Sequence, residues 1–531
     1  MGAAVLSCTM SESASGRRDI AGVVGWVGLL VGPGLGLLAY VLLPTARVDE
    51  SGALIGGLSG AGRATAAVAV MMAVWWMTEA LPLSATALLP IALFPVLGVS
   101  PIRQAVAPYA DPVIFLFMGG FILGLGMERW GLHKRIALLT ISVVGTRPVR
   151  LIGGFMVASA VMSMWVSNTA TAAMMLPIGV SVIGLVFARL GRDFERGAPP
   201  EPGRDGSNFA TCLMLGIAYG ASIGGIGTLI GTPPNTVLKG FVEREYGQVI
   251  TFAEWLRIGV PFVAVFLPIA WIVLTRFAFP VRLREIPGGK ALIAGELRDL
   301  GAMKRGEWAV FIVFCCTALA WVFHRPAADL LGFYSTADGV RRVYFLTDEG
   351  IAIIAALALF VIPVRPRERI FAMDWQTASR LPWGILLLFG GGLSLASAMD
   401  TTGVTRFIGE QFQALRGLPL VVTVAAIAGV VIFLTELTSN TAVTTTLMPV
   451  LAGAAVGLGV DPAYLLVPAA LAASCAFMLP VATPPNAIVF GSGYVSLPQM
   501  ARAGLMLNLI GIVLVSVAVL VLERFVVTVQ P

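Results

Sequence analysis

Charged side chains are scarce in this sequence. Asp, Glu, Lys and Arg together make up 12% of the 531 residues, and 57% of the residues are hydrophobic. Soluble domains carry about 25% charged residues, so this composition indicates a protein that lies in a lipid bilayer. The formal net charge is +6, but a nucleic-acid partner would require a soluble basic face, which so few charges do not provide. We therefore expect an integral membrane protein that binds no nucleic acid.

Histidine and paired cysteines are also lacking. The chain has two histidines and five cysteines, and four of the cysteines lie in apolar segments without the spacing of a disulfide framework or a zinc site. A membrane enzyme acting on lipids or peptides would need a nucleophile with a base, a metal cluster or a pair of carboxylates at the membrane face. The sequence offers none of these, so we expect that the protein is not an enzyme.

Long apolar runs, in contrast, are abundant. A transmembrane helix needs about 20 predominantly apolar residues. The apolar segments lie near residues 20–44, 65–80, 82–99, 112–127, 150–188, 210–242, 259–280, 308–324, 349–364, 383–399, 420–459, 463–494 and 504–527. Their number indicates a polytopic membrane protein that crosses the bilayer many times.

Two of these segments, 150–188 and 420–459, are too long for one span, and a polar cluster interrupts each in the middle. Each could form two full spans joined by a polar turn, or a re-entrant hairpin that enters and leaves by the same face. Arms of about 17 residues are at the short end for a span, which favours the hairpin. The sequence then predicts an all-α fold of about 11 transmembrane helices plus two re-entrant hairpins.

The distribution of Lys and Arg predicts the orientation in the membrane. With the N-terminus inside, 22 of the 35 Lys and Arg residues fall in the cytoplasmic loops 1–19, 128–150, 189–208, 281–307, 365–382 and 495–503. Cytoplasmic loops are enriched in these residues, so this orientation is favoured, and eleven spans place the C-terminus outside. Arg17 and Arg18 directly precede the first apolar run, which we interpret as a retained span. We expect a plasma or inner membrane.

The two halves of the sequence repeat each other. A Ser-Asn-Thr-Ala motif at 167–170 recurs at 439–442, an offset of 272 residues that also aligns the preceding apolar segments without a gap. A Thr-Pro-Pro-Asn motif at 232–235 recurs at 483–486, at a shorter offset of 251 because the charged loop at 189–208 has no counterpart. Five spans separate the two hairpins, and an odd number inverts the second copy. Inverted repeats with broken helices are typical of secondary transporters.

This repeat predicts the domain organisation. Residues 281–307, rich in Pro, Gly and basic side chains, form a cytoplasmic linker between the halves. The other parts are an N-terminal extension with the first span and an outer loop at 1–60, a first inverted repeat at 61–280 with its re-entrant hairpin at 150–188 and its broken helix at 210–242, and a second inverted repeat at 308–531 with its hairpin at 420–459 and its broken helix at 463–494.

The duplicated motifs carry the candidate chemistry. Serine hydroxyls, asparagine carbonyls and free backbone carbonyls are hard oxygen ligands suited to sodium, and helix N-termini at the same tips attract an anion. Proline cannot continue a helix, so we expect the Pro-Pro pairs to unwind the spans at 231–235 and 482–486. The motifs contain no Lys or Arg, so a bound dianion would be balanced by cations and helix dipoles. Interhelical bonding and simple kinks would explain a single motif, but duplication in inverted copies favours a transport site.

One acidic residue lies beside these motifs. Glu436 precedes the second Ser-Asn-Thr by three residues, and its counterpart in the first repeat is Met164. Ionisable residues inside a membrane are usually functional. Glu436 could therefore contact a cation directly, or it could bond to backbone near the hairpin tip.

These residues resemble those of the divalent-anion:sodium symporter family, which includes sodium–dicarboxylate, sodium–citrate and sodium–sulfate transporters. The resemblance covers residues 65–527, nearly the whole chain. Three stretches carry it together with both Ser-Asn-Thr motifs: WWMTEALPLSATALLP at 75–90, LPWGILLLFGGGLSLA at 381–396 and ASCAFMLPVATPPNAIV at 473–489.

The resemblance implies two or more sodium sites and a substrate site between the hairpin tips. One sodium site would use Ser163, Ser167, Asn168 and the backbone of Gly231, and the other Thr435, Ser439, Asn440 and the backbone of Ala482. The substrate carboxylates would contact Asn168, Thr169, Asn440 and Thr441, with Pro233, Thr483 and Pro484 lining the pocket. The family also implies a homodimer whose transport domain moves across the membrane as an elevator.

The predicted function is sodium-coupled symport of small divalent anions, with C4-dicarboxylates such as succinate, malate and fumarate as the favoured substrates. The alternatives are a sodium-independent dicarboxylate exchanger and a sodium-coupled citrate or sulfate transporter. The motifs respond to the charge of the anion, so they leave open which divalent anion is carried and how many sodium ions accompany it.

Overall fold

A computed structural model describes residues 25–48, 54–55, 57–144, 147–189, 205–283, 289–337, 341–413 and 417–522. Most of the predicted loop 189–208, the first 24 residues and residues 523–531 lie outside this part of the chain. The described residues are almost entirely helical, which confirms the predicted all-α membrane fold. Seven of their helices are long and apolar enough to cross a bilayer, and five shorter apolar helices accompany them. The total of eleven spans stays a prediction.

Strands are few and short. The described residues contain three antiparallel pairs: β1 (Arg47–Val48) with β2 (Leu54–Ile55), β3 (Tyr334–Ala337) with β4 (Arg341–Tyr344), and β5 (Pro363–Arg365) with β6 (Ile370–Phe371). Each pair joins segments close in sequence, so the strands act as local connections between helices.

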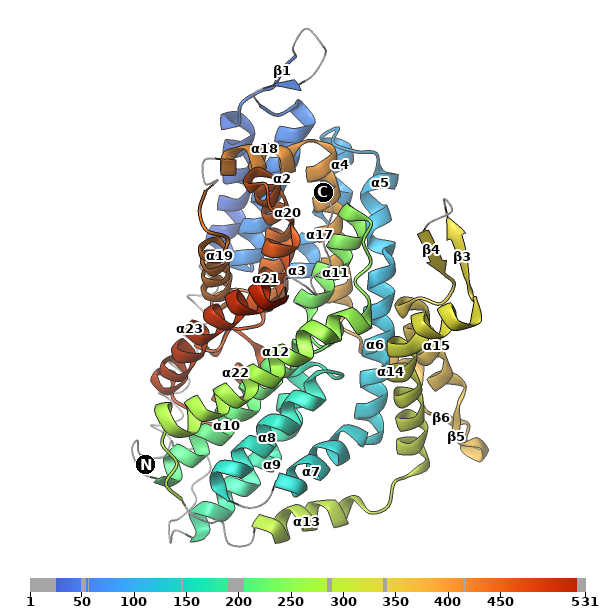
Figure 1. The fold of residues 1–531 in the computed structure, drawn as a ribbon, viewed down its shortest axis with the longest axis vertical. Helices are drawn as coiled ribbons and strands as arrows, with labels where there is room; N and C mark the ends of the chain where they lie inside the picture. The colour runs from blue at the N-terminus through green and yellow to red at the C-terminus, as the bar shows by residue number, and fades with distance from the viewer. Residues whose placement is uncertain are drawn as a thin grey trace. The chain divides into compact units, whose positions relative to one another are not determined.

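The contacts between helices divide the chain into two units, and Figure 1 labels helices of each. The first comprises residues 1–110, 383–417 and 442–462. Its described helices are Gly25–Leu42, α2 (Gly60–Thr78), α3 (Leu83–Thr86), α4 (Leu89–Val96), α5 (Ile102–Val106), η1 (Ala107–Ala110), α17 (Trp383–Thr401), α18 (Val404–Phe412) and most of α20 (Asn440–Leu458).

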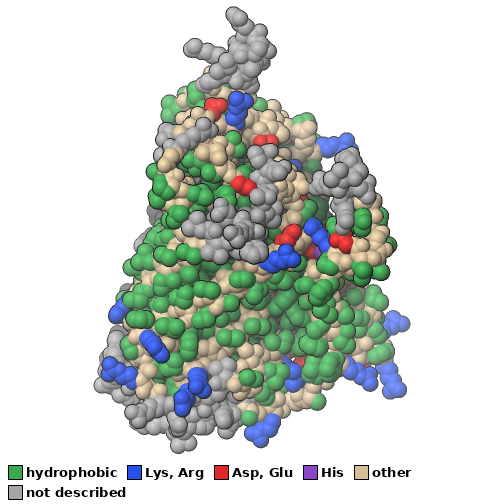
Figure 2. All heavy atoms as spheres, in the orientation of Figure 1, with side chains coloured by type: hydrophobic (Ala, Val, Ile, Leu, Met, Phe, Trp, Pro, Cys, Tyr) green, Lys and Arg blue, Asp and Glu red, His purple; other side chains and the backbone are tan. Residues whose placement is uncertain are grey.

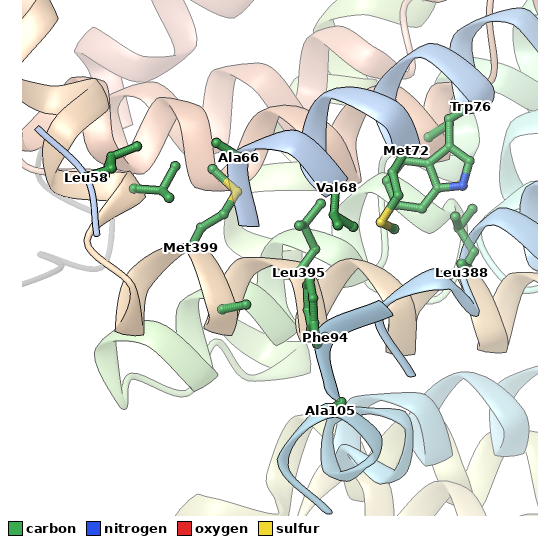
Figure 3. Packing of buried hydrophobic residues seen from close by; sticks show 14 residues of the cluster. Leu58, Ala66, Val68, Met72, Trp76, Phe94, Ala105, Leu388, Leu395 and Met399 are labelled. Atoms are coloured by element: carbon green, nitrogen blue, oxygen red, sulfur yellow. The ribbon is translucent and has the colours of Figure 1, made fainter. Parts of the chain in front are cut away.

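The core of the first unit lies between α2, α4 and α17. Trp76 and Met72 of α2 are fully buried, and Leu388 and Leu395 of α17 belong to the same cluster (Figure 3). The helices approach closely at glycine: a Cβ built at Gly391 would lie 2.3 Å from the carbonyl oxygen of Ala87. Small residues permit such backbone contact, on which helix packing in membranes relies.

The second unit comprises residues 111–382, 418–441 and 463–531. Its described helices are α6 (Pro112–Trp130), α7 (Leu132–Val144), α8 (Pro148–Ser163), α9 (Asn168–Arg189), α10 (Asp205–Gly225), α11 (Pro233–Tyr246), α12 (Phe252–Ile272), η2 (Val273–Ala278), α13 (Gly289–Leu300), α14 (Arg305–Leu331), α15 (Asp348–Val361), η3 (Pro366–Glu368), α16 (Trp375–Ala378), α19 (Leu420–Thr435), α21 (Ala463–Ala473), α22 (Pro484–Gly491) and α23 (Leu497–Leu522).

Local signals explain where several of these helices begin and end. Asp111 accepts the backbone N–H of Val113 (3.1 Å) and so caps α6, while Gly131 ends that helix in a left-handed conformation with φ +74°. Thr251 and Glu254 form a reciprocal capping box at the start of α12.

The broken helices differ from the prediction in one detail. The first break runs from the end of α10 at Gly225 to the start of α11 at Pro233, and the second from Ala473 to Pro484. The prolines therefore occupy the first positions of the following helices, where a missing N–H costs nothing, and the unwound residues precede them. The expectation that 231–235 and 482–486 unwind as a whole was wrong for this reason.

Figure 2 shows many hydrophobic side chains on the visible face, with Lys and Arg along its lower part and at several places above it. Helices α7 and α13 pack against each other. Lys134 pairs with Glu296 (3.0 Å), and Arg135 binds both carboxylate oxygens of Glu307 (3.1 Å each). A bidentate pair of this kind fixes the start of α14 against α7.

Gly391→Ala should destabilise the first unit, because the added methyl group would overlap the Ala87 carbonyl. We expect a lower melting temperature of the purified protein in detergent, corresponding to a loss of about 1–3 kcal/mol. Gly60→Ala is the control, since nothing lies within 4 Å of a Cβ at that position. Equal melting temperatures for the two variants would contradict the close approach of α17 to Ala87.

Candidate functional site

The first hairpin turns between α8 and α9. Ser163, the last residue of α8, is fully buried, and its hydroxyl bonds to the Oδ1 atom of Asn168, which begins α9. The Oγ atom of Ser167 accepts the N–H of Ala170 (3.2 Å) and caps the same helix. Three predicted site residues therefore meet at one helix-to-helix turn.

The first helix break meets this turn. A Cβ built at Gly225 would lie 2.7 Å from Asn168 Oδ1 and 3.0 Å from the carbonyl oxygen of Gly231. A Cβ built at Gly231 would lie 2.5 Å from the oxygen of Gly225 and 3.0 Å from that of Ser163. Backbone and side-chain oxygens thus converge where the backbone approaches so closely that only glycine fits. We call Ser163, Asn168, Gly225 and Gly231 the first cradle.

One side-chain amide hydrogen-bonds to the carbonyls that the first break leaves without a helical partner. The Nδ2 atom of Asn235 donates to the oxygens of Gly225 (3.3 Å), Ile226 (3.2 Å) and Thr228 (2.8 Å). The indole N–H of Trp255, on α12, also donates to Ile226 (2.9 Å). These bonds satisfy carbonyls that the missing helical turn would otherwise leave unpaired in an apolar region.

The second break repeats this arrangement at the offset of 251 residues. The Nδ2 atom of Asn486 donates to the oxygens of Ala476 (3.5 Å) and Leu479 (3.0 Å), which correspond to Gly225 and Thr228. The oxygen of Phe477, which corresponds to Ile226, accepts the hydroxyl of Tyr219 (2.8 Å). Equivalent carbonyls in the two halves are therefore bonded by equivalent asparagines of the duplicated motif.

Glu436 binds the backbone N–H groups of the second break. Its carboxylate accepts from Phe477 (2.6 Å), Met478 (2.8 Å) and Leu479 (2.9 Å), and from the Nδ2 atom of Asn508 (2.7 Å). Of the two roles considered for this residue, the structure shows the bonding to backbone. The first repeat has no carboxylate there; instead the hydroxyl of Thr228 bonds to the carbonyl of Met164, the counterpart of Glu436.

The remaining predicted residues lie at the second hairpin and the second break. Thr435, fully buried at the end of α19, donates to the Ile432 carbonyl (2.9 Å), and Ser439 precedes α20, which begins at Asn440 and Thr441. Ala482 is buried directly before Thr483, whose Oγ1 atom accepts the N–H of Asn486 (3.4 Å) and caps α22. Thr169 and Pro484 are exposed, and Pro233 is partly buried.

Eight helix ends flank these motifs. The carbonyl ends of α8, α10, α19 and α21 and the N–H ends of α9, α11, α20 and α22 all lie at motif residues or at the breaks beside them. Carbonyl ends favour cations and N–H ends favour anions. Across the described residues there is no group of three or more His, Cys, Asp or Glu that could hold a metal ion. A cation at the cradle would therefore be held by hydroxyl, amide and carbonyl oxygens, the ligand type that sodium prefers.

Sequence reasoning missed four residues that shape the site. Asn235 and Asn486 belong to the duplicated Thr-Pro-Pro-Asn motif, and their duplication was the signal that could have revealed their role. Tyr219 and Trp255 lie in apolar segments outside any motif, so nothing in the sequence distinguished them.

A buried ion pair was also missed. Lys239 of α11 is fully buried, and its ammonium group contacts Glu349 of α15 (2.6 Å) and Glu243 (2.9 Å). Because the two carboxylates compensate this charge, Lys239 ties α11 to α15 without supplying a free positive charge.

Gly231→Ala should abolish cation binding at the first cradle, because the new methyl group would overlap the Gly225 carbonyl. We expect the stabilisation of the purified protein by sodium, measured as a shift in melting temperature, to be lost or strongly reduced. Gly491→Ala provides a matched control in α22, where a Cβ meets nothing within 4 Å. A sodium shift that is equal in both variants would show that the first cradle binds no sodium.

Glu436→Leu should destabilise the second unit by about 3 kcal/mol or more, since three backbone N–H groups, one buried and two partly buried, lose their acceptor. Glu436→Gln keeps one acceptor oxygen and should lose less. Glu410→Leu is the control, because Glu410 pairs only weakly with exposed Arg406 (3.4 Å). The melting temperature in detergent is measured for all three variants. A Glu436→Leu protein that melts at the same temperature as Glu410→Leu would contradict the hydrogen bonds described above.

Comparison with known proteins gives consistent results. A family model described as "Sodium:sulfate symporter transmembrane region" matches residues 54–529. A protein named "Sodium-dependent dicarboxylate transporter SdcS" from Staphylococcus saprophyticus is 42% identical over 496 residues, which cover 93% of this chain and 90% of that protein. Its namesake from Staphylococcus aureus is 40% identical over 494 residues, with the same coverage.

Two solved transporter structures resemble the fold. The YdaH transporter of Alcanivorax borkumensis gives a TM-score of 0.57 at 13% identity and covers 96% of this chain and 100% of that chain. MtrF of Neisseria gonorrhoeae, described as an antimetabolite efflux pump, gives a TM-score of 0.52 at 12% identity, with 94% of each chain covered. At such low identity the likeness concerns the fold alone.

Proposed function

The chain belongs to the sodium:sulfate symporter family, a family of membrane transporters and not of enzymes, and on that premise we propose that it couples the inward movement of sodium to the uptake of a C4-dicarboxylate. The substrate class is supported by the relatives named as sodium-dependent dicarboxylate transporters, which are 40–42% identical over nearly the whole chain. The sodium:sulfate description of the family keeps sulfate as an alternative anion, and citrate is the other alternative that the sequence leaves open.

The observation that carries the proposal is the convergence of oxygens at the first cradle. Asn168 Oδ1 and the carbonyls of Gly225 and Gly231 lie so close together that no methyl group fits between them. Side-chain and backbone oxygens that converge in this way are hard ligands that can share one small cation with the donors already bonded to them. Sodium, with Ser163 and Ser167 as further ligands, has the charge and ligand preference required.

The second sodium site uses Thr435, Ser439, Asn440 and the backbone of Ala482. The similar bonding of the two breaks supports this assignment, because Asn235 and Asn486 orient equivalent carbonyls in each repeat. The two sites together supply at least two positive charges. That number balances a dicarboxylate, which the motifs themselves, lacking Lys and Arg, do not.

The substrate carboxylates bind at the N–H ends of α9 and α20, against Asn168, Thr169, Asn440 and Thr441. Pro233, Thr483 and Pro484 line the same pocket at the starts of α11 and α22. Helix N-termini stabilise anions through free N–H groups and the helix dipole. Sodium binds first and orders the hairpin tips, and the dianion then completes the site.

Transport proceeds by an elevator movement in a homodimer, with the N-terminus in the cytoplasm and the C-terminus outside a plasma or inner membrane. When more positive than negative charge enters in each cycle, the membrane potential contributes about 2.3 kcal/mol per 100 mV for each excess charge. Inside-negative potentials should therefore accelerate uptake.

The decisive experiment is radiolabelled succinate uptake into proteoliposomes, with an inward sodium gradient and then with potassium in place of sodium. Accumulation that occurs only when sodium is present supports the symporter. Uptake without sodium that requires dicarboxylate inside the vesicles would identify an exchanger. Competition by unlabelled malate, fumarate, citrate and sulfate ranks the substrates, and uptake of sulfate or citrate in preference to succinate would refute the dicarboxylate assignment.

Asn168→Ala and Asn440→Ala should each reduce sodium-dependent succinate uptake to the background of empty vesicles, because each removes a ligand shared by sodium and substrate. Asn208→Ala is the control, since the Asn208 amide bonds to the Pro280 carbonyl (3.0 Å) at the exposed start of α10. All three proteins should elute as folded particles in detergent. Normal uptake by both motif variants would refute the site assignment.

A further inference from the structure

We propose that the hydroxyl of Tyr219 is a positioning group that couples the two sodium sites, so that occupation of one raises the affinity of the other. The inference rests on the proposed function, because it treats the two helix breaks as sodium sites. It goes further by giving one residue outside the duplicated motifs a defined part in the cooperativity of cation binding.

Tyr219 lies in α10 and is fully buried. Its hydroxyl donates to the carbonyl of Phe477 (2.8 Å) and lies 3.4 Å from that of Met500, while its ring packs edge-on against Phe477 with centroids 5.1 Å apart. Phe477 belongs to the second unwound segment, so its carbonyl has no helical partner. Tyr219 therefore helps to set the conformation of that segment.

The helix that carries Tyr219 ends at the first cradle. Gly225, the last residue of α10, is six residues beyond Tyr219, about 9 Å along the helix. The backbones of α10 and α8 are in contact, since a Cβ at Gly224 would lie 2.3 Å from the Ala160 carbonyl and a Cβ at Gly220 2.7 Å from that of Met156. A cation bound at Asn168 and Gly225 would therefore act on the end of α10, the helix that also carries Tyr219.

The contacted segment leads directly to the second site. Both backbone polar groups of Phe477 are hydrogen-bonded. Its carbonyl accepts from the Tyr219 hydroxyl, and its N–H donates to Glu436 (2.6 Å). Glu436 directly follows Thr435, a residue of the second sodium site. The bonds from Tyr219 to Phe477 and from Phe477 to Glu436 thus link α10 to the second hairpin.

The two repeats differ at this point, and the difference identifies the link. Ile226 and Phe477 are equivalent carbonyls, and each accepts a hydrogen bond from an aromatic side chain. The donor to Ile226 is Trp255, which follows it within the first repeat, whereas the donor to Phe477 is Tyr219, from the opposite repeat. A bond within one repeat stabilises one break, while a bond between repeats transmits a change from one to the other.

A second contact joins the breaks. The hydroxyls of Ser474 and Thr232 are 3.5 Å apart, and Thr232 directly follows Gly231 of the first cradle. At this length the bond is weaker than that of Tyr219. Ser474→Ala should therefore have the same kind of effect as Tyr219→Phe, but a smaller one.

Tyr219→Phe tests the proposal, because it removes the donor and keeps the ring. The measurement is the initial rate of succinate uptake into proteoliposomes as a function of sodium concentration, at saturating succinate. We expect a Hill coefficient above 1 in the unmodified protein that falls toward 1 in the variant. The sodium concentration for half-maximal rate should rise about threefold to tenfold, with the maximal rate at saturating sodium retained. Tyr344→Phe, which loses an exposed bond to Asp329 (3.0 Å), should change none of these values.

The outcomes separate coupling from other roles. A uniform loss of maximal rate in Tyr219→Phe, with the Hill coefficient unchanged, would mean that Tyr219 only stabilises the fold and would overturn the proposal. An unmodified protein with a Hill coefficient of 1 would overturn it as well. If Tyr219→Phe does not fold, Ser474→Ala decides, and an unchanged Hill coefficient there counts against the coupling. Sodium-independent uptake by the unmodified protein would instead refute the proposed function itself.

Discussion

Interrupting a helix inside a membrane leaves carbonyl and N–H groups that no water molecule can satisfy. This constraint explains most of the bonding around the two helix breaks. Asn235 and Asn486 donate to the freed carbonyls, Trp255 and Tyr219 donate to one more in each break, and Glu436 accepts three N–H groups. The first break also lies against the tip of the first hairpin, since a Cβ built at Gly225 would be 2.7 Å from Asn168 Oδ1. In the proposed function, carbonyls freed by unwinding bind a cation at the first cradle without a charged ligand.

The two breaks meet the same constraint with different groups. In the second repeat a buried carboxylate, Glu436, binds the unwound backbone directly. In the first, the hydroxyl of Thr228 bonds to the backbone of Met164, at the position that Glu436 occupies in the other copy. The second break therefore has an acidic side chain close to its hairpin and the first does not. The two proposed sodium sites therefore differ in the groups beside them, although equivalent carbonyls are bonded in both breaks.

The sequence was sufficient for the fold class and the family, because hydropathy and duplicated motifs depend on local composition and spacing. It identified Ser163, Asn168 and Gly231, which the structure brings together with Gly225. It misplaced the unwound residues, since proline suggests a break but fits the first position of a new helix equally well. It did not reveal Tyr219 or the Lys239 ion pair, whose partners lie 258 and 110 residues away in the chain. Such contacts follow from packing, which no local pattern records.

In the proposed function a dianion binds because sodium supplies the positive charge that the motifs lack. The sharpest test is the equilibrium affinity of the purified protein for succinate, measured by calorimetry across a range of sodium concentrations at constant ionic strength. We expect succinate binding to weaken steeply as potassium replaces sodium and to be lost when sodium is absent. The same succinate affinity in sodium and in potassium would rule this explanation out.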